Sequence, residues 1–77
     1  MNKVDSLFLI EFGKNLRMLR KSKKITQHQL AIDAEIEISQ ISRIERGILN
    51  TSISNIHSIA RALQVKTSLL FEFDDLT

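Results

Sequence analysis

The segment 38–47, with the sequence ISQISRIERG, carries side chains that could bind a polar ligand. Its isoleucines, Ile38, Ile41 and Ile44, recur with the spacing of a buried helix face. Serine, glutamine and arginine fill the intervals, and such side chains exchange hydrogen bonds with base edges and phosphates. The polar face is therefore either solvated or presented to a ligand, and the spacing alone leaves both interpretations open.

The other reactive side chains form no catalytic or metal-binding pattern. The two histidines, His28 and His57, have no cysteine or suitably spaced carboxylate beside them. Asp33, Glu35 and Glu37 are close in sequence, but a cluster without a second set of ligands is usually solvated. The sequence also contains no glycine-rich phosphate loop and no nucleophile motif. We therefore predict that the protein is not an enzyme and has no metal site and no cofactor.

Composition and length favour one small helical domain. The 77 residues are 43% hydrophobic and include no cysteine and no proline, so disulfides are excluded and helix packing must provide the stability. A chain this short buries only about 60% of its unfolded surface, which leaves no room for a second core. The longest apolar run, 7–10, cannot cross a membrane, and no secretory signal is recognisable. We predict a single domain over 1–77, no membrane partner and a cytoplasmic location.

Positive charge is concentrated at the start of the chain. The net charge is +2, but residues 1–25 carry seven lysines and arginines against Asp5 and Glu11. Such a cluster suits phosphate binding. It is equally typical of the solvated face of an amphipathic helix, so charge alone does not decide between the two.

Helices must position these side chains, and the sequence predicts the first two clearly. Apolar residues recur at helical intervals from 9 to 19, which predicts a helix from Ser6 to Ser22. Leu7, Phe8 and Met18 fall outside this stripe and either extend the core or face a second subunit. Thr26 and Gln29 have the spacing of a capping box, which predicts the start of a second helix. Its inward face would be formed by Leu30, Ala31 and Ala34.

The third helix follows after the short break 35–37 and ends at Gly47, as helices often do at glycine. Two short helices joined by so tight a turn are a helix-turn-helix candidate. Ile48 is expected to turn inward in the loop that follows.

Two further helices complete the prediction. Ser52 is a suitable N-cap for a fourth helix, whose buried stripe would be Ile53, Ile56, Ile59, Ala60 and Leu63. Thr67 would cap a short fifth helix, in which Leu70 and either Phe71 or Phe73 close the core. The predicted fold is all-α, with five helices around one centre.

The residues from 19 to 65 resemble the Cro/C1-type helix-turn-helix family of bacterial DNA-binding regulators, also called the xenobiotic-response-element family. The resemblance depends on the joint spacing of Thr26–Gln27, Leu30–Ala31, Ala34, Ile36, Ile41–Ser42, Glu45–Arg46–Gly47, Asn50, Ser52 and Ala62–Leu63. It implies a five-helix, lambda-repressor-like DNA-binding domain in which helices 2 and 3 form the helix-turn-helix.

The family likeness implies that the third helix reads base edges in the major groove. The residues at its start would read them: Glu37, Ile38, Ser39, Gln40 and Arg43. Arg43 is the first choice, because a guanidinium can bridge O6 and N7 of guanine. Ile38 either packs inward with Ile41 or touches a thymine methyl group. Glu37 could accept from cytosine, although capping its own helix is the simpler role.

The family likeness also implies phosphate contacts and a structural ion pair. The expected phosphate-binding residues are Gln27, Arg46, Asn50, Thr51 and Ser52. Thr51 and Ser52 serve equally well as turn and cap residues. Arg20 and Glu45 occupy positions that pair in several relatives, so both are expected to be structural.

Three turns depart from the family pattern. Relatives usually have glycine where this chain has Lys24, Glu35 and Gln64, and left-handed backbone at such residues costs roughly 1 kcal/mol each. Glu35 also adds negative charge near the expected DNA side.

The predicted function is sequence-specific binding of double-stranded DNA by a small transcriptional regulator, such as a repressor. A homodimer on a pseudo-palindromic site is expected, with a contact through Leu69 to Phe73 or, as a second option, through Leu7 and Phe8. The alternative function is a protein-interaction module, such as an antitoxin-like or accessory regulator. Its contact surface would comprise Leu7, Phe8, Leu69, Leu76 and whichever of Phe71 and Phe73 is not buried.

Overall fold

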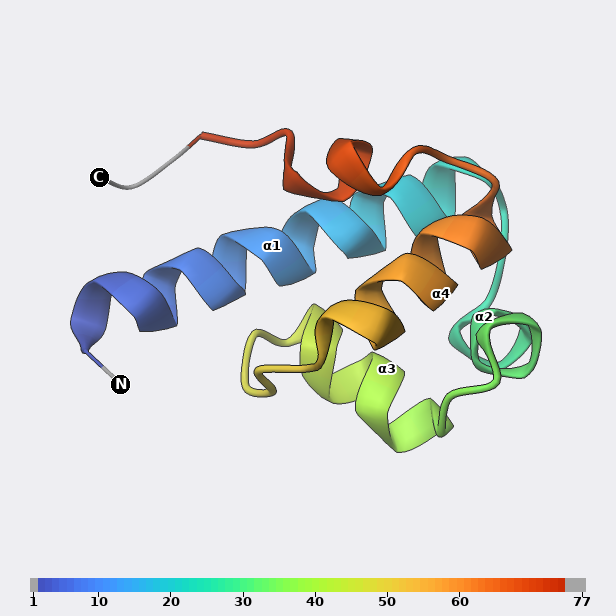
Figure 1. Ribbon diagram of the computed structural model, residues 1–77, viewed down its shortest axis with the longest axis horizontal. Helices are drawn as coiled ribbons and strands as arrows, with labels where there is room; N and C mark the ends of the chain where they lie inside the picture. Colours follow the sequence, from blue (N-terminus) through green and yellow to red (C-terminus); the bar gives the residue numbers. More distant parts are fainter. Residues whose placement is uncertain (1, 75–77) are drawn as a thin grey trace.

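The computed structural model describes residues 2–74, which form four α-helices and one short 3-10 helix (Figure 1). The elements are α1 (Lys3–Ser22), α2 (Gln27–Ala34), α3 (Ile38–Glu45), α4 (Ile53–Leu63) and η1 (Thr67–Phe71). These residues contain no strand, so the prediction of an all-helical fold is confirmed. None of these helices is both long enough and apolar enough to cross a membrane.

The prediction of a fifth α-helix is wrong, because the last element is a five-residue 3-10 helix. Its backbone bonds span three residues, as in the 2.9 Å bond from the Leu69 N–H to the Lys66 carbonyl. Thr67 is the first helical residue and not the cap, and no side chain caps this end. Asn15 of α1 instead holds the segment, since its Nδ2 donates to the carbonyls of Leu69 at 3.1 Å and Leu70 at 2.9 Å.

Side-chain caps set the start of three α-helices. α1 begins three residues before the predicted start, because the Asn2 Oδ1 accepts from the Asp5 N–H at 2.9 Å. The predicted caps at Thr26 and Ser52 are confirmed, with hydroxyls that accept from backbone N–H groups at 3.0 and 3.1 Å. Gln29 donates its side-chain N–H to Asp33 at 2.8 Å, and its side-chain oxygen accepts no bond from the Thr26 N–H, so only half of the capping box forms.

The three turns that lack glycine are all left-handed. Lys24, Glu35 and Gln64 have φ values of 59°, 57° and 59°. At each turn, the next residue donates its N–H to a carbonyl in the last turn of the helix; the bond from Val65 to Ala60 is 3.0 Å long. The fold therefore keeps the backbone geometry that glycine would provide and accepts the steric cost of a side chain there.

Gln64→Gly is expected to raise the free energy of unfolding by about 0.5–1 kcal/mol, because glycine adopts left-handed backbone without the Cβ contact. Thermal denaturation followed by circular dichroism would measure the change. Lys66→Gly is the control, since Lys66 is exposed but has an ordinary φ of −65°. That variant is expected to be destabilised. A lower melting temperature for both variants would contradict the relief of strain at Gln64.

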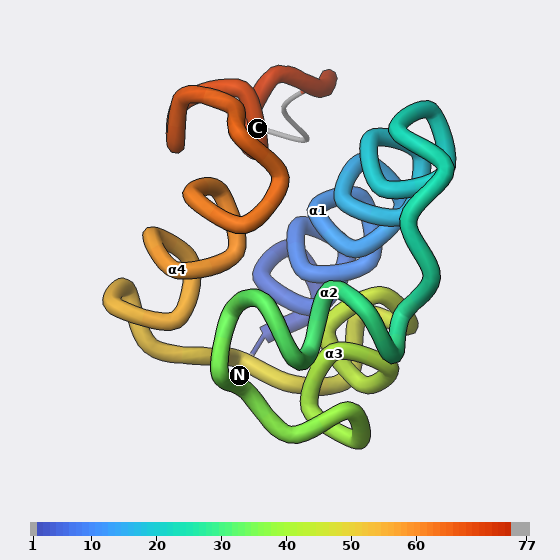
Figure 2. Tube along the Cα trace, turned by 90° about the vertical axis from the view of Figure 1, so that its right-hand side faces the viewer, coloured from blue at the N-terminus to red at the C-terminus, as the bar shows by residue number. Residues whose placement is uncertain are grey.

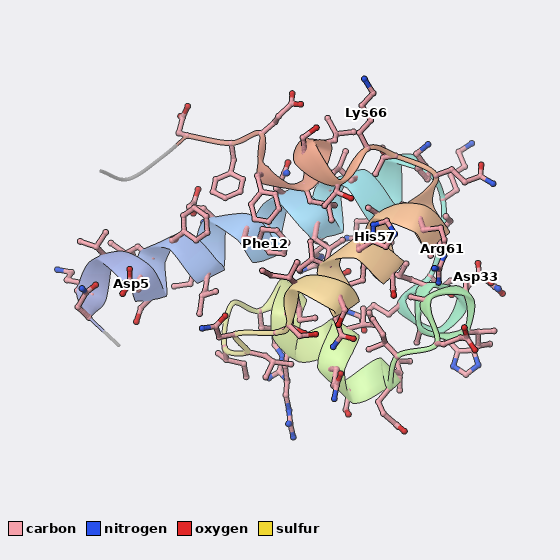
Figure 3. All side chains as sticks on the ribbon, viewed as in Figure 1. Asp5, Phe12, Asp33, His57, Arg61 and Lys66 are labelled. Carbon is pink, nitrogen blue, oxygen red and sulfur yellow. The ribbon has the colours of Figure 1, made fainter. Side chains whose placement is uncertain are left out.

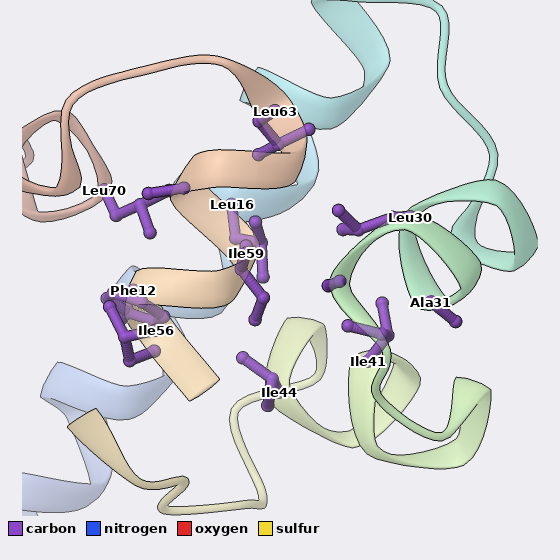
Figure 4. Packing of buried hydrophobic residues seen from close by; sticks show 12 residues of the cluster. Phe12, Leu16, Leu30, Ala31, Ile41, Ile44, Ile56, Ile59, Leu63 and Leu70 are labelled. Carbon is purple, nitrogen blue, oxygen red and sulfur yellow. The ribbon is translucent and has the colours of Figure 1, made fainter. Parts of the chain in front are cut away.

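The core is formed by apolar side chains from all five elements. Ile41 and Ile44 of α3 point toward Leu30 of α2 and Ile59 of α4 (Figure 4). The complete buried set is Phe12, Leu16, Leu30, Ala31, Ala34, Ile41, Ile44, Ile56, Ile59, Ala60, Leu63 and Leu70. This packing fixes which face of α3 remains in contact with solvent.

Two isoleucines predicted to be buried are exposed. Ile48 is 63% exposed, because it follows Gly47, whose left-handed φ of 75° turns the chain outward; Leu49 packs against the core instead. Ile53 is 88% exposed, since it lies in the first turn of α4 beside a surface hollow. The prediction for both residues is wrong.

Candidate nucleic-acid interface

Three neighbouring segments share one side of the molecule: α2, α3 and the loop 46–52. In Figures 1 and 2, α3 lies at the lower edge and the C-terminal end of α1 near the top. The basic cluster at the end of α1 therefore does not border the exposed face of α3. Of the two interpretations that charge left open, the structure favours a solvated helix face.

The exposed face of α3 holds four of the five residues expected to read bases. Ile41, Ile44 and Glu45 are buried, whereas Ser39 and Arg43 are exposed and Gln40 is half-buried. Ile38 is 43% exposed, so of its two expected positions it occupies the outward one. Arg43 has no ion-pair partner among residues 2–74. These side chains could therefore contact base edges while the isoleucines of α3 stay packed in the core.

Glu37 occupies the N-cap position of α3, but its carboxylate accepts no capping hydrogen bond. Its backbone carbonyl accepts instead, from the N–H groups of Gln40 at 3.0 Å and Ile41 at 3.2 Å. The expected capping role of the Glu37 side chain is therefore wrong. The carboxylate is exposed at the start of the helix.

The loop after α3 has fewer side chains without an internal hydrogen bond than the expected phosphate contacts would need. Arg46 and Asn50 are exposed, and the Arg46 Nε makes only a long 3.4 Å bond to the Ser42 carbonyl. The Thr51 hydroxyl accepts from the Asn55 Nδ2 at 2.9 Å, and the Ser52 hydroxyl caps α4. The last two residues thus perform the turn and cap roles that the sequence also allowed.

Arg20 and Glu45 form a buried ion pair between α1 and α3. The Arg20 Nε and Nη2 donate to the two Glu45 carboxylate oxygens at 2.6 and 3.0 Å, and Nη1 donates to the Ile25 carbonyl at 2.8 Å. Hydrogen bonding to Glu45 raises the pKa of Arg20 above its ordinary value, although burial acts in the opposite direction. Arg20 therefore stays charged over the whole working pH range, and this charged fork fixes the end of α3 to α1.

Gln27, the first residue of α2, joins this ion pair. Its Nε2 donates to the Glu45 Oε1 at 2.9 Å, and the side chain is half-buried. The family resemblance implied a phosphate contact for Gln27 and did not indicate this bond. Charge patterning could not reveal it, because the two residues lie 18 positions apart and meet only when α2 packs on α3.

In the part of the chain that the structure describes, the remaining histidine and carboxylate side chains do not form a catalytic or metal-binding cluster. His28 and His57 are both exposed, and Figure 3 shows His57 on α4. Asp33, Glu35 and Glu37 are also exposed. Within residues 2–74, no group of three histidine or carboxylate side chains is arranged to hold a metal ion.

The sequence matches a helix-turn-helix domain family over residues 11–72. The chain belongs to the helix-turn-helix family. This membership confirms the predicted relationship. The protein is 40% identical over 63 residues to the control protein C.BamHI of Bacillus amyloliquefaciens, a match that covers 80% of this chain and 78% of that protein.

Two further relatives fit the same family. The immunity repressor protein of Bacillus phage phi105 is 36% identical over 58 residues, or 75% of this helix-turn-helix protein and 40% of the repressor. The crystal structure of the restriction-modification controller protein C.AhdI from Aeromonas hydrophila superimposes with a TM-score of 0.81 and 38% identity. That match covers 82% of this chain and 96% of the controller.

Proposed function

We propose that the protein is a small transcriptional regulator that binds a specific double-stranded DNA sequence through α3. The observation that carries this proposal is the division of α3 into two faces. Ile41 and Ile44 are buried, whereas Ser39 and Arg43 are exposed at one edge of the molecule. A helix displayed in this way can enter a major groove. The arrangement is lambda-repressor-like, in one domain over 1–77, with η1 as its fifth element.

Each exposed residue has a proposed role in the complex. Arg43 reads guanine, Ile38 meets a thymine methyl group, and Ser39 and Gln40 exchange hydrogen bonds with other base edges. Glu37, with its carboxylate exposed, accepts from the cytosine N4 amino group.

The phosphate contacts flank this helix. Gln27 and the N-terminus of α2 bind the backbone on one side. Arg46 and Asn50 bind it on the other, with secondary contacts from the hydroxyls of Thr51 and Ser52.

Arg43→Ala is expected to weaken binding to the preferred duplex by about 1–3 kcal/mol and to relax base preference at one position. The melting temperature is expected to stay within the range of a surface substitution. The preferred sequence would first be selected from a random duplex pool, and affinity would then be measured by fluorescence anisotropy.

Arg61→Ala is the matched control, since it removes an exposed arginine from α4. It is expected to preserve base preference. Equal losses for both variants on every sequence would contradict base reading by Arg43. Affinity of the wild-type protein that does not fall with salt would contradict phosphate binding.

We further propose that the protein binds its site as a homodimer. The two predicted contact regions lie side by side, because the rings of Phe8 and Phe73 are 5.3 Å apart. The buried ring of Phe12 on α1 (Figure 3) lies 5.0 Å from that of Phe71. A hollow of about 180 Å³ borders this cluster and is lined in part by Ile53. Leu76, also part of the expected contact, lies outside the described residues.

Ile53→Glu is expected to shift the protein from dimer to monomer, because it places a charge on an 88% exposed apolar side chain beside the hollow. Sedimentation velocity at micromolar concentration would measure the change. Ile32→Glu is the control, since Ile32 is 56% exposed but lies on α2 and does not line the hollow. A wild-type protein that is monomeric with and without DNA would contradict the homodimer.

The alternative function, a protein-interaction module, is not favoured by the relatives, which are named as control, repressor and regulator proteins. DNA binding also implies a cytoplasmic location for the protein.

A further inference from the structure

Glu45 is the point at which hydrogen bonds join three helices. Its Oε2 accepts from the Arg20 Nε at 2.6 Å, and its Oε1 accepts from both the Arg20 Nη2 at 3.0 Å and the Gln27 Nε2 at 2.9 Å. The Glu45 side chain is only 2% exposed. Gln27 is less buried, so it is the member of this network that reaches the surface at the start of α2.

The chemistry of the carboxylate restricts how the amide of Gln27 can lie. A carboxylate only accepts hydrogen bonds, so Glu45 selects the orientation in which Gln27 turns its NH2 group, and not its carbonyl oxygen, toward the network. An amide NH2 group has two N–H donors. One donates to Glu45, and among residues 2–74 the other has no partner.

Arg20 makes this arrangement compatible with a nearby anion. An isolated carboxylate beside DNA would repel phosphate, but the guanidinium of Arg20 lies against Glu45 at 2.6 Å and balances its charge. A hydrogen bond to an ionised acceptor also holds the Gln27 side chain more firmly than a bond to a neutral group. The amide is therefore oriented before any ligand arrives.

We propose that Glu45 is a positioning residue for binding of the DNA backbone: it fixes the Gln27 NH2 group as a bridge between its own carboxylate and a phosphate oxygen. This inference rests on the proposed function. It assigns Glu45 a role beyond its ion pair with Arg20, because it makes the affinity for phosphate depend on a buried side chain that does not touch DNA.

A double-mutant cycle separates this role from a purely structural one. The four proteins are the wild type, Glu45→Gln, Gln27→Met and the double variant, each assayed on the selected duplex at a temperature where circular dichroism shows it folded. If Glu45 acts through Gln27, each single variant loses affinity about tenfold, the value of one hydrogen bond, and the double variant loses no more than that. A loss of about a hundredfold in the double variant, the product of two independent effects, would overturn the proposal.

The side-chain amide resonances of Gln27 provide a second readout that stability does not affect. In the free wild-type protein, they are expected away from the values of a solvated glutamine, and Glu45→Gln is expected to return them to those values. DNA is expected to shift them again in the wild type. Resonances that do not respond to the Glu45 substitution would overturn the proposal. If Glu45→Gln does not fold, Glu45→Asp replaces it, since it keeps the charge and shortens the reach to Gln27.

The same assays distinguish failure of this inference from failure of the proposed function. A wild-type protein that binds no duplex would defeat both. A wild-type protein that binds, with Arg43→Ala weakened but Glu45 and Gln27 independent, would defeat only the positioning role.

Discussion

Glu45→Ala is expected to lower the free energy of unfolding by about 3–5 kcal/mol, the cost of removing one partner from a buried ion pair. The variant leaves the guanidinium of Arg20 buried, with only the Ile25 carbonyl as a remaining acceptor. The total free energy of unfolding of a small domain is about 5–15 kcal/mol, so this change is a large fraction of its stability. Urea denaturation would measure it, and DNA affinity is expected to fall as well, because the end of α3 loses its link to α1.

Arg43→Ala is the control within the same helix, since its side chain is exposed and the substitution is expected to alter stability by less than about 0.5 kcal/mol. Equal destabilisation by both variants would show that the buried and exposed faces of α3 are assigned incorrectly. The double variant Arg20→Met with Glu45→Leu tests whether the unpaired charge of Arg20 causes the loss of stability. It removes both charges, and it is expected to recover most of the lost stability, because no unpaired charge stays buried.

Local signals were sufficient to predict the four α-helices. The caps at Thr26 and Ser52 and the turn at Gly47 involve residues within a few positions of one another, so the sequence shows them directly. The turns at Glu35 and Gln64 are a different case, because relatives usually have glycine there and the sequence left open whether the turns would keep the family's geometry. The structure has positive φ at both.

Features that depend on how the helices pack on one another could not be predicted from the periodicity of the sequence. Ile53 continues the apolar stripe of α4. A stripe identifies one face of a helix, but it does not show which residues of that face are covered by other elements. The 3-10 form of η1 depends on Asn15, whose side chain bonds to carbonyls more than fifty positions away. The bond between Gln27 and Glu45 likewise needs the packing of α2 on α3. These contacts arise from tertiary structure and leave no local pattern.

Gly13 is another such case, and Gly13→Ala is expected to destabilise the protein strongly. The residue is buried in the middle of α1, where a Cβ atom would lie 2.5 Å from the Glu45 carbonyl oxygen and would also collide with that of Ile44. Alanine normally favours a helix over glycine by about 0.5–1 kcal/mol. Forcing an atom into a filled site costs about 1–3 kcal/mol or more, and here the obstacle is backbone that cannot rotate away. The net loss is therefore expected to be about 2 kcal/mol, measured by urea denaturation.

The same contact links Gly13 to the proposed DNA surface. The two obstructing carbonyls belong to the last turn of α3, so relief of the collision must move α3 away from α1 and strain the bonds between Arg20 and Glu45. Gly13→Ala is thus expected to weaken DNA binding even at temperatures where the variant is folded. Arg17→Ala, an exposed substitution on α1, should leave both properties nearly unchanged. A more stable Gly13→Ala variant would mean that helix propensity outweighs the collision, and that α1 and α3 are not in close contact at this position.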